Sequence, residues 1–219
     1  MRILEHDIAS YHNVRHTYDP SRSMIWREIC RHLQRYVRED GAVLDLGAGY
    51  GDFSRHIRAG TKYGLEQNGS LVRHWSDDVQ PLIQSALDPF PLEDAVVDTV
   101  FASNFFEHFL LDDSCRILSE VERVLRPGGL FIAIQPNIRL EPGRYYDDYT
   151  HKTAFTEVSF SDFLASLGWR VRACEGRFLP LTMKSRLPKW GWLARLYLSL
   201  PFRPWAGQFL VVAETPANA

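Results

Sequence analysis

A turn with three closely spaced glycines constrains the fold of this chain more than any other feature. It lies in the sequence VLDLGAGYGDF, residues 43–53, where an apolar run of strand length leads into a helical stretch. Glycine lets the backbone turn sharply and approach a ligand closely, and the first turn of the following helix leaves backbone N–H groups free. The sequence therefore predicts a nucleotide or nucleoside site at the carboxyl edge of a parallel sheet.

Short apolar runs and amphipathic stretches alternate along the chain. The short runs predict strands, and apolar residues at three- and four-residue spacing predict helices. Such an alternation indicates βαβ units and a mainly parallel α/β sheet. The expected strands are 42–46, 62–65, 82–87, 96–102, 130–134, 169–174 and 208–213, and the expected helices are 21–38, 113–126 and 156–167.

The composition is that of one water-soluble globular domain. Of the 219 residues, 45% are hydrophobic and 24% are charged, so a core can form without disulfides or metals. The 25 Lys and Arg residues against 27 Asp and Glu residues give no overall attraction to nucleic acid or anionic lipid. A polar N-terminus, the lack of a run of ~20 apolar residues and three widely spaced cysteines favour a cytoplasmic protein with no secretory signal and no transmembrane span.

We expect a single domain, 1–219, whose parts differ in composition. They are an N-terminal arm and helix (1–40), a core (41–175), a cap segment (176–207), and a last strand with a tail (208–219). The cap segment has six basic residues, no acidic one and three of the six tryptophans. Two interpretations stay open: the helical spacing of Trp190, Leu193, Leu196, Tyr197 and Leu200 suits packing on the core, whereas Trp and Arg side chains suit a phosphorylated or lipid-linked sugar. Contact with a membrane surface is a third possibility.

The spacing of the glycines and two carboxylates indicate which ligand the turn binds. A dinucleotide-binding turn needs the spacing GxGxxG, but here the third glycine comes one residue early and Asp45 stands two residues before the first. A carboxylate that close repels a pyrophosphate and suits a ligand with a positive charge. At the end of the second expected strand, Glu66 can accept hydrogen bonds from both hydroxyls of a ribose.

With these motifs, almost the whole chain resembles the class I S-adenosylmethionine-dependent methyltransferases. The matching segments are the turn 45–51, Glu66, the segment 86–98, the strand end 102–104 with Phe106-Glu107-His108, and Leu125-Arg126-Pro127-Gly128-Gly129. The resemblance implies a Rossmann-like, doubly wound sheet of about seven strands whose last strand is antiparallel, and S-adenosyl-L-methionine as cofactor. Ser85 stands where members of the family often have an aspartate. The implied cofactor-binding residues are Asp45, Gly47, Ala48, Gly49, Gly51, Phe53, Glu66, Gln67, Ser85, Ala86, Leu87 and Asn104.

Transfer of a methyl group from a sulfonium ion makes few demands on the protein. The reaction is an in-line displacement that needs no metal, so the site must exclude water and hold the acceptor ~3 Å from the methyl carbon. An oxygen acceptor also needs a group that takes its proton. The candidates are His108 after the fourth expected strand and Asp148 and His151 after the fifth; each also has a structural interpretation, as a loop, turn-forming or hydrogen-bonded residue.

These observations favour O-methylation of a small-molecule or carbohydrate-derived acceptor. The segments 135–139, 145–153 and 177–180 resemble a bacterial methyltransferase subgroup often encoded beside carbohydrate-assembly genes. A protein or RNA methyltransferase is the alternative enzyme, although no basic stripe with interleaved aromatics lies outside the cap segment and we expect no nucleic-acid partner. A catalytically inactive, cofactor-binding regulatory or scaffold protein is the alternative from another class. The sequence leaves the oligomeric state open.

Overall fold

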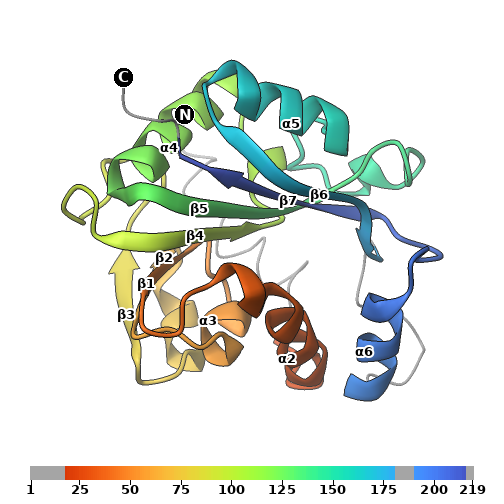
Figure 1. The fold of residues 1–219 in the computed structure, drawn as a ribbon, viewed down its shortest axis with the longest axis horizontal. Helices are drawn as coiled ribbons and strands as arrows, with labels where there is room; N and C mark the ends of the chain where they lie inside the picture. The colour runs from red at the N-terminus through yellow and green to blue at the C-terminus, as the bar shows by residue number, and fades with distance from the viewer. Residues whose placement is uncertain (1–17, 181–189, 216–219) are drawn as a thin grey trace.

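Seven strands form one sheet in the order β3-β2-β1-β4-β5-β7-β6 (Figure 1). The structure is a computed structural model that describes residues 18–180 and 190–215. Neighbours among β1 to β5 pair in parallel, and β7 is antiparallel to both β5 and β6. The predicted α/β fold, doubly wound with an antiparallel last strand, is confirmed. The strands are β1 (Ala42–Leu46), β2 (Thr61–Glu66), β3 (Val79–Ile83), β4 (Val97–Ser103), β5 (Leu125–Pro136), β6 (Arg170–Leu179) and β7 (Gln208–Glu214).

Helices cover both faces of the sheet. Figure 1 shows α4 and α5 on one side and α2, α3 and α6 on the other. The α-helices are α2 (Arg22–Leu33), α3 (Asp52–His56), α4 (Leu111–Val124), α5 (Glu157–Ser166) and α6 (Gly191–Ser199). Four short 3-10 turns lie between them: η1 (Gln34–Tyr36), η2 (Gly69–His74), η3 (Phe106–His108) and η4 (Tyr145–Asp147).

The alternation of side chains along the strands produces two cores. Phe131 and Ala133 of β5 pack with α4 and α5, whereas Ile132 and Ile134 pack with α2 and α3. Successive residues of a strand point to opposite faces, and both faces here are apolar because helices cover both. The central strands are therefore buried on both faces, and their polar residues lie mainly at the strand ends.

Several boundaries differ from the predictions. The third strand is Val79–Ile83 instead of 82–87, because those five residues pair in register with Lys62–Glu66 of β2 and the chain then turns at Ser85. The first helix stops at Leu33 and tightens into η1, and α4 stops at Val124, ahead of the Pro-Gly-Gly sequence. A capping box formed by Thr156 and Ser159 begins α5 close to the predicted residue.

The cap segment starts later than predicted, because β6 continues through Leu179 and so takes residues 176–179 into the sheet. Its helix α6 lies beside α2 (Figure 1). Trp190 is 50% exposed and Leu196 is exposed as well, so the interpretation of their spacing as a core-packing stripe is wrong, and the residue of α6 that packs inward is Leu198. No helix among residues 18–180 and 190–215 is long and apolar enough to cross a membrane.

Among the described residues, two ion pairs connect the cap segment to the rest of the fold. Arg195 of α6 donates to Glu28 of α2, with 3.0 Å between Nε and Oε2. Arg203 donates to Glu175 of β6, with 2.5 Å between Nη1 and Oε2. These two arginines therefore hold the segment in place and are already engaged by carboxylates. Lys184, Arg186 and Lys189, also expected to contribute positive charge here, lie outside the described residues, as does most of the N-terminal arm.

Candidate cofactor and acceptor site

The three glycines of the first turn all have left-handed backbone conformations. Their φ angles are 69° at Gly47, 53° at Gly49 and 71° at Gly51, a region that disfavours other residues. A Cβ on Gly47 would lie 2.5 Å from Cδ2 of Phe105, and one on Gly51 would lie 2.7 Å from Cδ1 of Trp75. The backbone conformation therefore favours glycine at all three positions, and space requires it at Gly47 and Gly51. Gly47 lies against Phe105, which follows β4.

Backbone hydrogen bonds fix the turn to the neighbouring strand. The N–H groups of Gly47 and Ala48 both donate to the carbonyl oxygen of Leu65, at 2.9 and 3.1 Å. The indole Nε1 of Trp75 donates to the carbonyl oxygen of Gly49 at 2.8 Å. Trp75 was missed in the sequence, where no motif distinguishes it, yet it both supports the turn and fills the space beside Gly51.

Glu66 lies at the carboxyl end of β2 and is held in one orientation. Its side chain is only 6% exposed; Oε2 accepts from the N–H of Gly49 at 3.0 Å and Oε1 accepts from the N–H of Asn68 at 2.8 Å. Each carboxylate oxygen can accept a second hydrogen bond. The side chain is therefore oriented by the turn and retains acceptor capacity for two adjacent hydroxyls.

Asp45 is buried directly before the turn. Its Oδ2 accepts from the hydroxyl of Ser54 at 2.6 Å. Burial raises the pKa of Asp45 to about 7, although the hydrogen bond from Ser54 opposes the rise. A cationic ligand beside this carboxyl would favour its ionised form, as expected of a ligand that carries an amino group.

The other predicted cofactor residues lie in different surroundings. Ser85 follows β3, and its hydroxyl accepts from the N–H of Leu87 at 3.2 Å, so it shapes that turn. Asn104 follows β4 with a φ of 49°, and its Oδ1 accepts from Gln208 at 3.2 Å. Ala86 is buried, whereas Gln67 and Leu87 are exposed. Phe53 is stacked on Phe101 with 3.8 Å between the ring centroids, so the structure gives it a place in the core.

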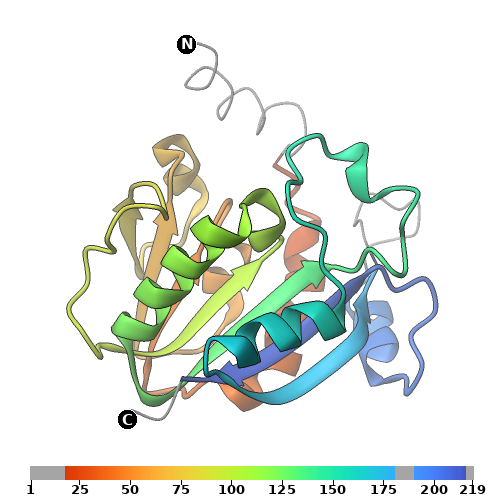
Figure 2. The same ribbon diagram turned by 90° about the horizontal axis from the view of Figure 1, so that it is seen from above.

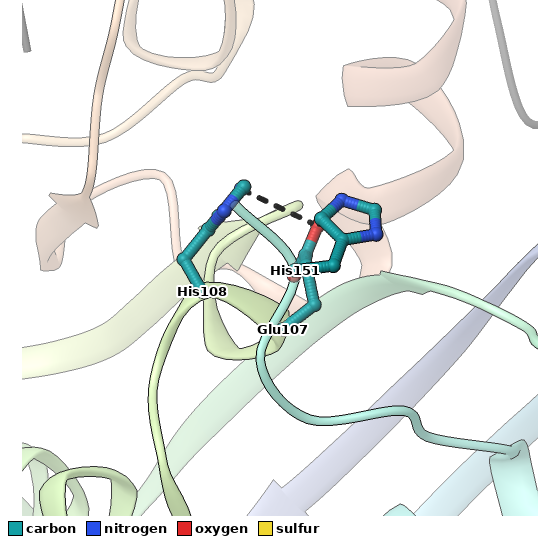
Figure 3. Close-up of side chains that lie close together, drawn as sticks. All are labelled: Glu107, His108 and His151. Carbon is teal, nitrogen blue, oxygen red and sulfur yellow. Dashed lines mark ion pairs between the residues drawn. The ribbon is translucent and has the colours of Figure 1, made fainter. Parts of the chain in front are cut away.

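A second group of polar side chains forms where the segment after β4 meets the loop after β5. Figure 2 shows β4 and β5 ending at the same edge of the sheet, beside this loop. The N–H groups of Lys152 and Thr153 donate to the carbonyl oxygen of Glu107 at 2.7 and 3.1 Å. This bridge brings His151 close to Glu107 and His108 (Figure 3).

The three side chains in Figure 3 lie close together, and the carboxyl oxygens of Glu107 have no hydrogen-bond partner among the described residues. Oε1 of Glu107 lies 3.8 Å from Nε2 of His108 and 3.9 Å from Nε2 of His151. Burial raises the pKa of Glu107 to about 8. Burial, and to a smaller extent the neighbouring His151, lowers the pKa of His108 to about 4. Near neutral pH, His108 is therefore uncharged.

Asp148 reaches His108 through a third residue. Its Oδ1 accepts from the hydroxyl of Thr150 at 2.6 Å and from the N–H of Thr150 at 3.1 Å, the geometry of a turn-forming aspartate. The same hydroxyl lies 2.9 Å from Nδ1 of His108. The structure thus brings the three predicted catalytic residues into one cluster. It adds Glu107 and Thr150, which the sequence analysis contained only as members of the resembling segments 106–108 and 145–153.

Comparisons with known proteins agree with this geometry. A family model described as a methyltransferase domain matches residues 44–133. A sarcosine/dimethylglycine N-methyltransferase of Halorhodospira halochloris is 33% identical over 117 residues, which are 48% of this chain and 40% of that protein. A Mycolicibacterium smegmatis protein named a probable S-adenosylmethionine-dependent methyltransferase is 36% identical over 157 residues, 68% of this chain and 58% of that protein. Residues 44–133 therefore match a methyltransferase domain, and the chain is similar to class I S-adenosylmethionine-dependent methyltransferases.

The matched segment contains the glycine turn, Glu66 and the Glu107-His108 pair, and the cofactor of the family is S-adenosylmethionine. The fold extends the likeness beyond this segment. A S-adenosylmethionine-dependent methyltransferase structure from Archaeoglobus fulgidus superposes with a TM-score of 0.66 at 18% identity, covering 94% of this chain and 98% of that one. The chain spans well under two thirds of the length of the curated relatives it matches. The acceptors named for these relatives are therefore not assigned to this chain.

Proposed function

We propose that this protein transfers the methyl group of S-adenosylmethionine to a small-molecule acceptor. The observation that carries the proposal is the arrangement around Glu66: a buried, oriented carboxylate with free acceptor capacity, beside a turn that only glycines can form. Asp45 faces the same turn and suits the positive charge of the cofactor's amino group. The named relatives that act on sarcosine and dimethylglycine support a small acceptor.

We propose an acceptor oxygen, as the sequence predicts, because groups able to take a proton lie together at this edge of the sheet. In the reaction the acceptor oxygen bonds to the methyl carbon, the carbon–sulfur bond breaks, and the sulfonium becomes the thioether of S-adenosylhomocysteine. The hydroxyl proton passes to Nε2 of His151 or His108. Thr150 and Asp148 orient the His108 ring and do not themselves take the proton.

An acceptor nitrogen is the second candidate, because three of the curated relatives are named as N-methyltransferases. A neutral amine attacks the methyl carbon without a base. A primary or secondary amine then loses a proton to water, whereas a tertiary amine such as dimethylglycine becomes a quaternary ammonium and loses none. The two candidates therefore differ in how strongly they depend on the histidines. A carbohydrate-derived acceptor remains the proposed refinement of the oxygen candidate.

A test measures S-adenosylhomocysteine formation with panels of hydroxylated small molecules and of small amines, including sarcosine and dimethylglycine. For an oxygen acceptor, His151→Ala should lower kcat by about 100- to 10,000-fold while S-adenosylhomocysteine affinity stays unchanged. For an amine acceptor, the same variant should retain most of its turnover. Cofactor binding without product from either panel, but with labelled protein or RNA in a cell extract, would contradict the small-molecule proposal; no product from any source would favour a regulatory or scaffold role.

A further inference from the structure

The carboxyl group of Glu107 is buried with no cation and no hydrogen-bond donor on its oxygens, among the described residues, to stabilise its ionised form. Its side chain is 1% exposed, and neither carboxylate oxygen has a hydrogen-bond partner among the described residues. Burying an ionised carboxylate in this way is costly unless a cation or several donors face it. What faces Oε1 of Glu107 is instead a pair of imidazole nitrogens, Nε2 of His108 and Nε2 of His151 (Figure 3).

The hydrogen bonds behind His108 determine which of its nitrogens carries the proton. The hydroxyl of Thr150 has one proton and donates it to Asp148. It must therefore accept from Nδ1 of His108, which lies 2.9 Å away. In the neutral ring the lone pair is then on Nε2, the nitrogen that faces Glu107. Such an outer hydrogen bond on the far nitrogen is the usual support of a metal-binding histidine.

The distances suit an intervening cation better than direct contact. Nε2 of His108 and Oε1 of Glu107 are 3.8 Å apart, beyond the 2.7–3.2 Å of a hydrogen bond. The three ligand atoms all lie within 4.8 Å of one another. Ligands about 2.1 Å from a tetrahedral metal are about 3.4 Å apart, so small side-chain rotations close the cluster around an ion.

We propose that Glu107, His108 and His151 bind one divalent first-row transition metal ion, such as Zn²⁺, Mn²⁺ or Fe²⁺. Two imidazoles with one carboxylate favour these ions over Mg²⁺ and Ca²⁺, which prefer all-oxygen ligands. The sequence predicted a protein without a metal because methyl transfer itself needs none. The proposed ion serves another purpose, since it stabilises the ionised form of a buried carboxyl group whose oxygens have no hydrogen-bond partner among the described residues.

Three protein ligands leave coordination positions open for an oxygen of the acceptor. Phe105, two residues before Glu107, packs against Gly47 of the cofactor turn, so the ion lies on the side of the site where an acceptor approaches. This role in holding the acceptor rests on the proposed function. The binding of the ion does not, and it is measured without cofactor or acceptor. With the ion bound, Nε2 of both histidines is a ligand, so the ion rather than a histidine would activate the acceptor hydroxyl, whose proton would leave to water.

The test titrates Zn²⁺ into the full chain after removal of metals with a chelator, by calorimetry, and records the visible absorption of the Co²⁺ form. We expect one ion per chain and a Co²⁺ spectrum typical of nitrogen and oxygen ligands. Glu107→Gln and His151→Asn should each lower Zn²⁺ affinity at least tenfold. Thr150→Val should lower it about 10- to 100-fold because it frees the His108 ring.

A matched control uses a histidine outside the cluster. His56→Gln, at the end of α3, where the ring contacts the hydroxyl of Ser23, should leave Zn²⁺ affinity unchanged. Melting temperatures and S-adenosylhomocysteine titration of each variant identify any that fails to fold, and Zn²⁺ should raise the melting temperature of the wild type but not of Glu107→Gln. Absence of stoichiometric binding, or equal binding by wild type and Glu107→Gln, would overturn the proposal whatever the outcome of the methyl-transfer assays.

Discussion

Replacing Glu66 perturbs the cofactor site at its best-defined point. The carboxylate has two oriented oxygens, and we expect each to accept one ribose hydroxyl in addition to its backbone donor. Loss of two charge-assisted hydrogen bonds should cost about 2 to 4 kcal/mol, which is a roughly 30- to 1,000-fold weaker affinity for S-adenosylhomocysteine. Glu66→Gln keeps the size of the side chain but can accept from only one of the two backbone N–H groups.

Because Glu66→Gln leaves one backbone N–H group without an acceptor, we also expect it to lower the stability of the fold. An N–H group left without its acceptor costs about 1 to 3 kcal/mol when buried, and both Gly49 and Asn68 are partly buried. The cofactor titration must therefore be run well below the melting temperature of the variant. Glu66→Ala removes both acceptor oxygens, so its melting temperature should fall further than that of Glu66→Gln.

Isothermal titration calorimetry of wild type, Glu66→Gln and Glu66→Ala with S-adenosylhomocysteine measures the effect directly. Glu93→Gln is the control, because Glu93 is an exposed glutamate and its replacement should change neither affinity nor melting temperature. An affinity of Glu66→Gln within threefold of the wild type, in protein shown to be folded, would refute the assignment of Glu66 to the ribose.

Three further predictions concern buried charge and the cap segment. Burial raises the pKa of Asp45 to about 7, so the folded chain retains a proton that the unfolded chain releases above pH 4. The free energy of unfolding of the wild type should therefore fall as pH rises to 7. In thermal melts of Asp45→Asn this fall should be smaller by about 2 to 4 kcal/mol. Parallel pH profiles of the wild type and the variant would contradict this. Burial also raises the pKa of Glu175, but hydrogen bonds from His32 and Arg203 outweigh it and lower the value to about 2. The stabilisation is present above pH 4.5 and lost as pH falls towards 2, so Glu175→Gln should cost about 2 to 3 kcal/mol in urea unfolding at pH 7 and little at pH 2.5. Trp190→Ala should change the free energy of unfolding by less than about 1 kcal/mol, whereas Leu198→Ala should cost about 2 to 5 kcal/mol; the reverse order would show that the exposed tryptophan supports the core.

The elements of the sheet could be predicted because their signals are local. Each central strand is a short apolar run, and each large helix has apolar residues at helical spacing. A few consecutive residues are therefore enough to predict whether one face or both faces of an element are buried. The third strand was the exception: the apolar run 82–87 is a plausible strand by itself, but pairing with β2 places β3 at Val79–Ile83. The sequence does not show which of these two overlapping stretches is the strand; the pairing register with β2 decides it.

Local sequence also determined the glycine turn and the carboxylate beside it, where we propose that the cofactor binds. The glycine turn and Glu66 each need a particular backbone position next to a strand, and both follow from the strand pattern. Phe53 shows the limit of such reasoning, since it follows the turn directly, yet it is buried against Phe101. The direction in which a side chain points depends on what packs over the helix that carries it.

Only the tertiary structure brought Glu107 and His108 together with His151, more than 40 residues away in the chain. Their contact depends on the hydrogen bonds from the N–H groups of Lys152 and Thr153 to the carbonyl oxygen of Glu107. These are backbone hydrogen bonds, so the residue types in the loop do not predict them. Only the tertiary structure likewise pairs Arg195 with Glu28 and Arg203 with Glu175. The sequence alone determined which strands and turns form, because those depend on neighbouring residues. The fold decided which charges are buried together, because that depends on contacts between segments distant in the chain.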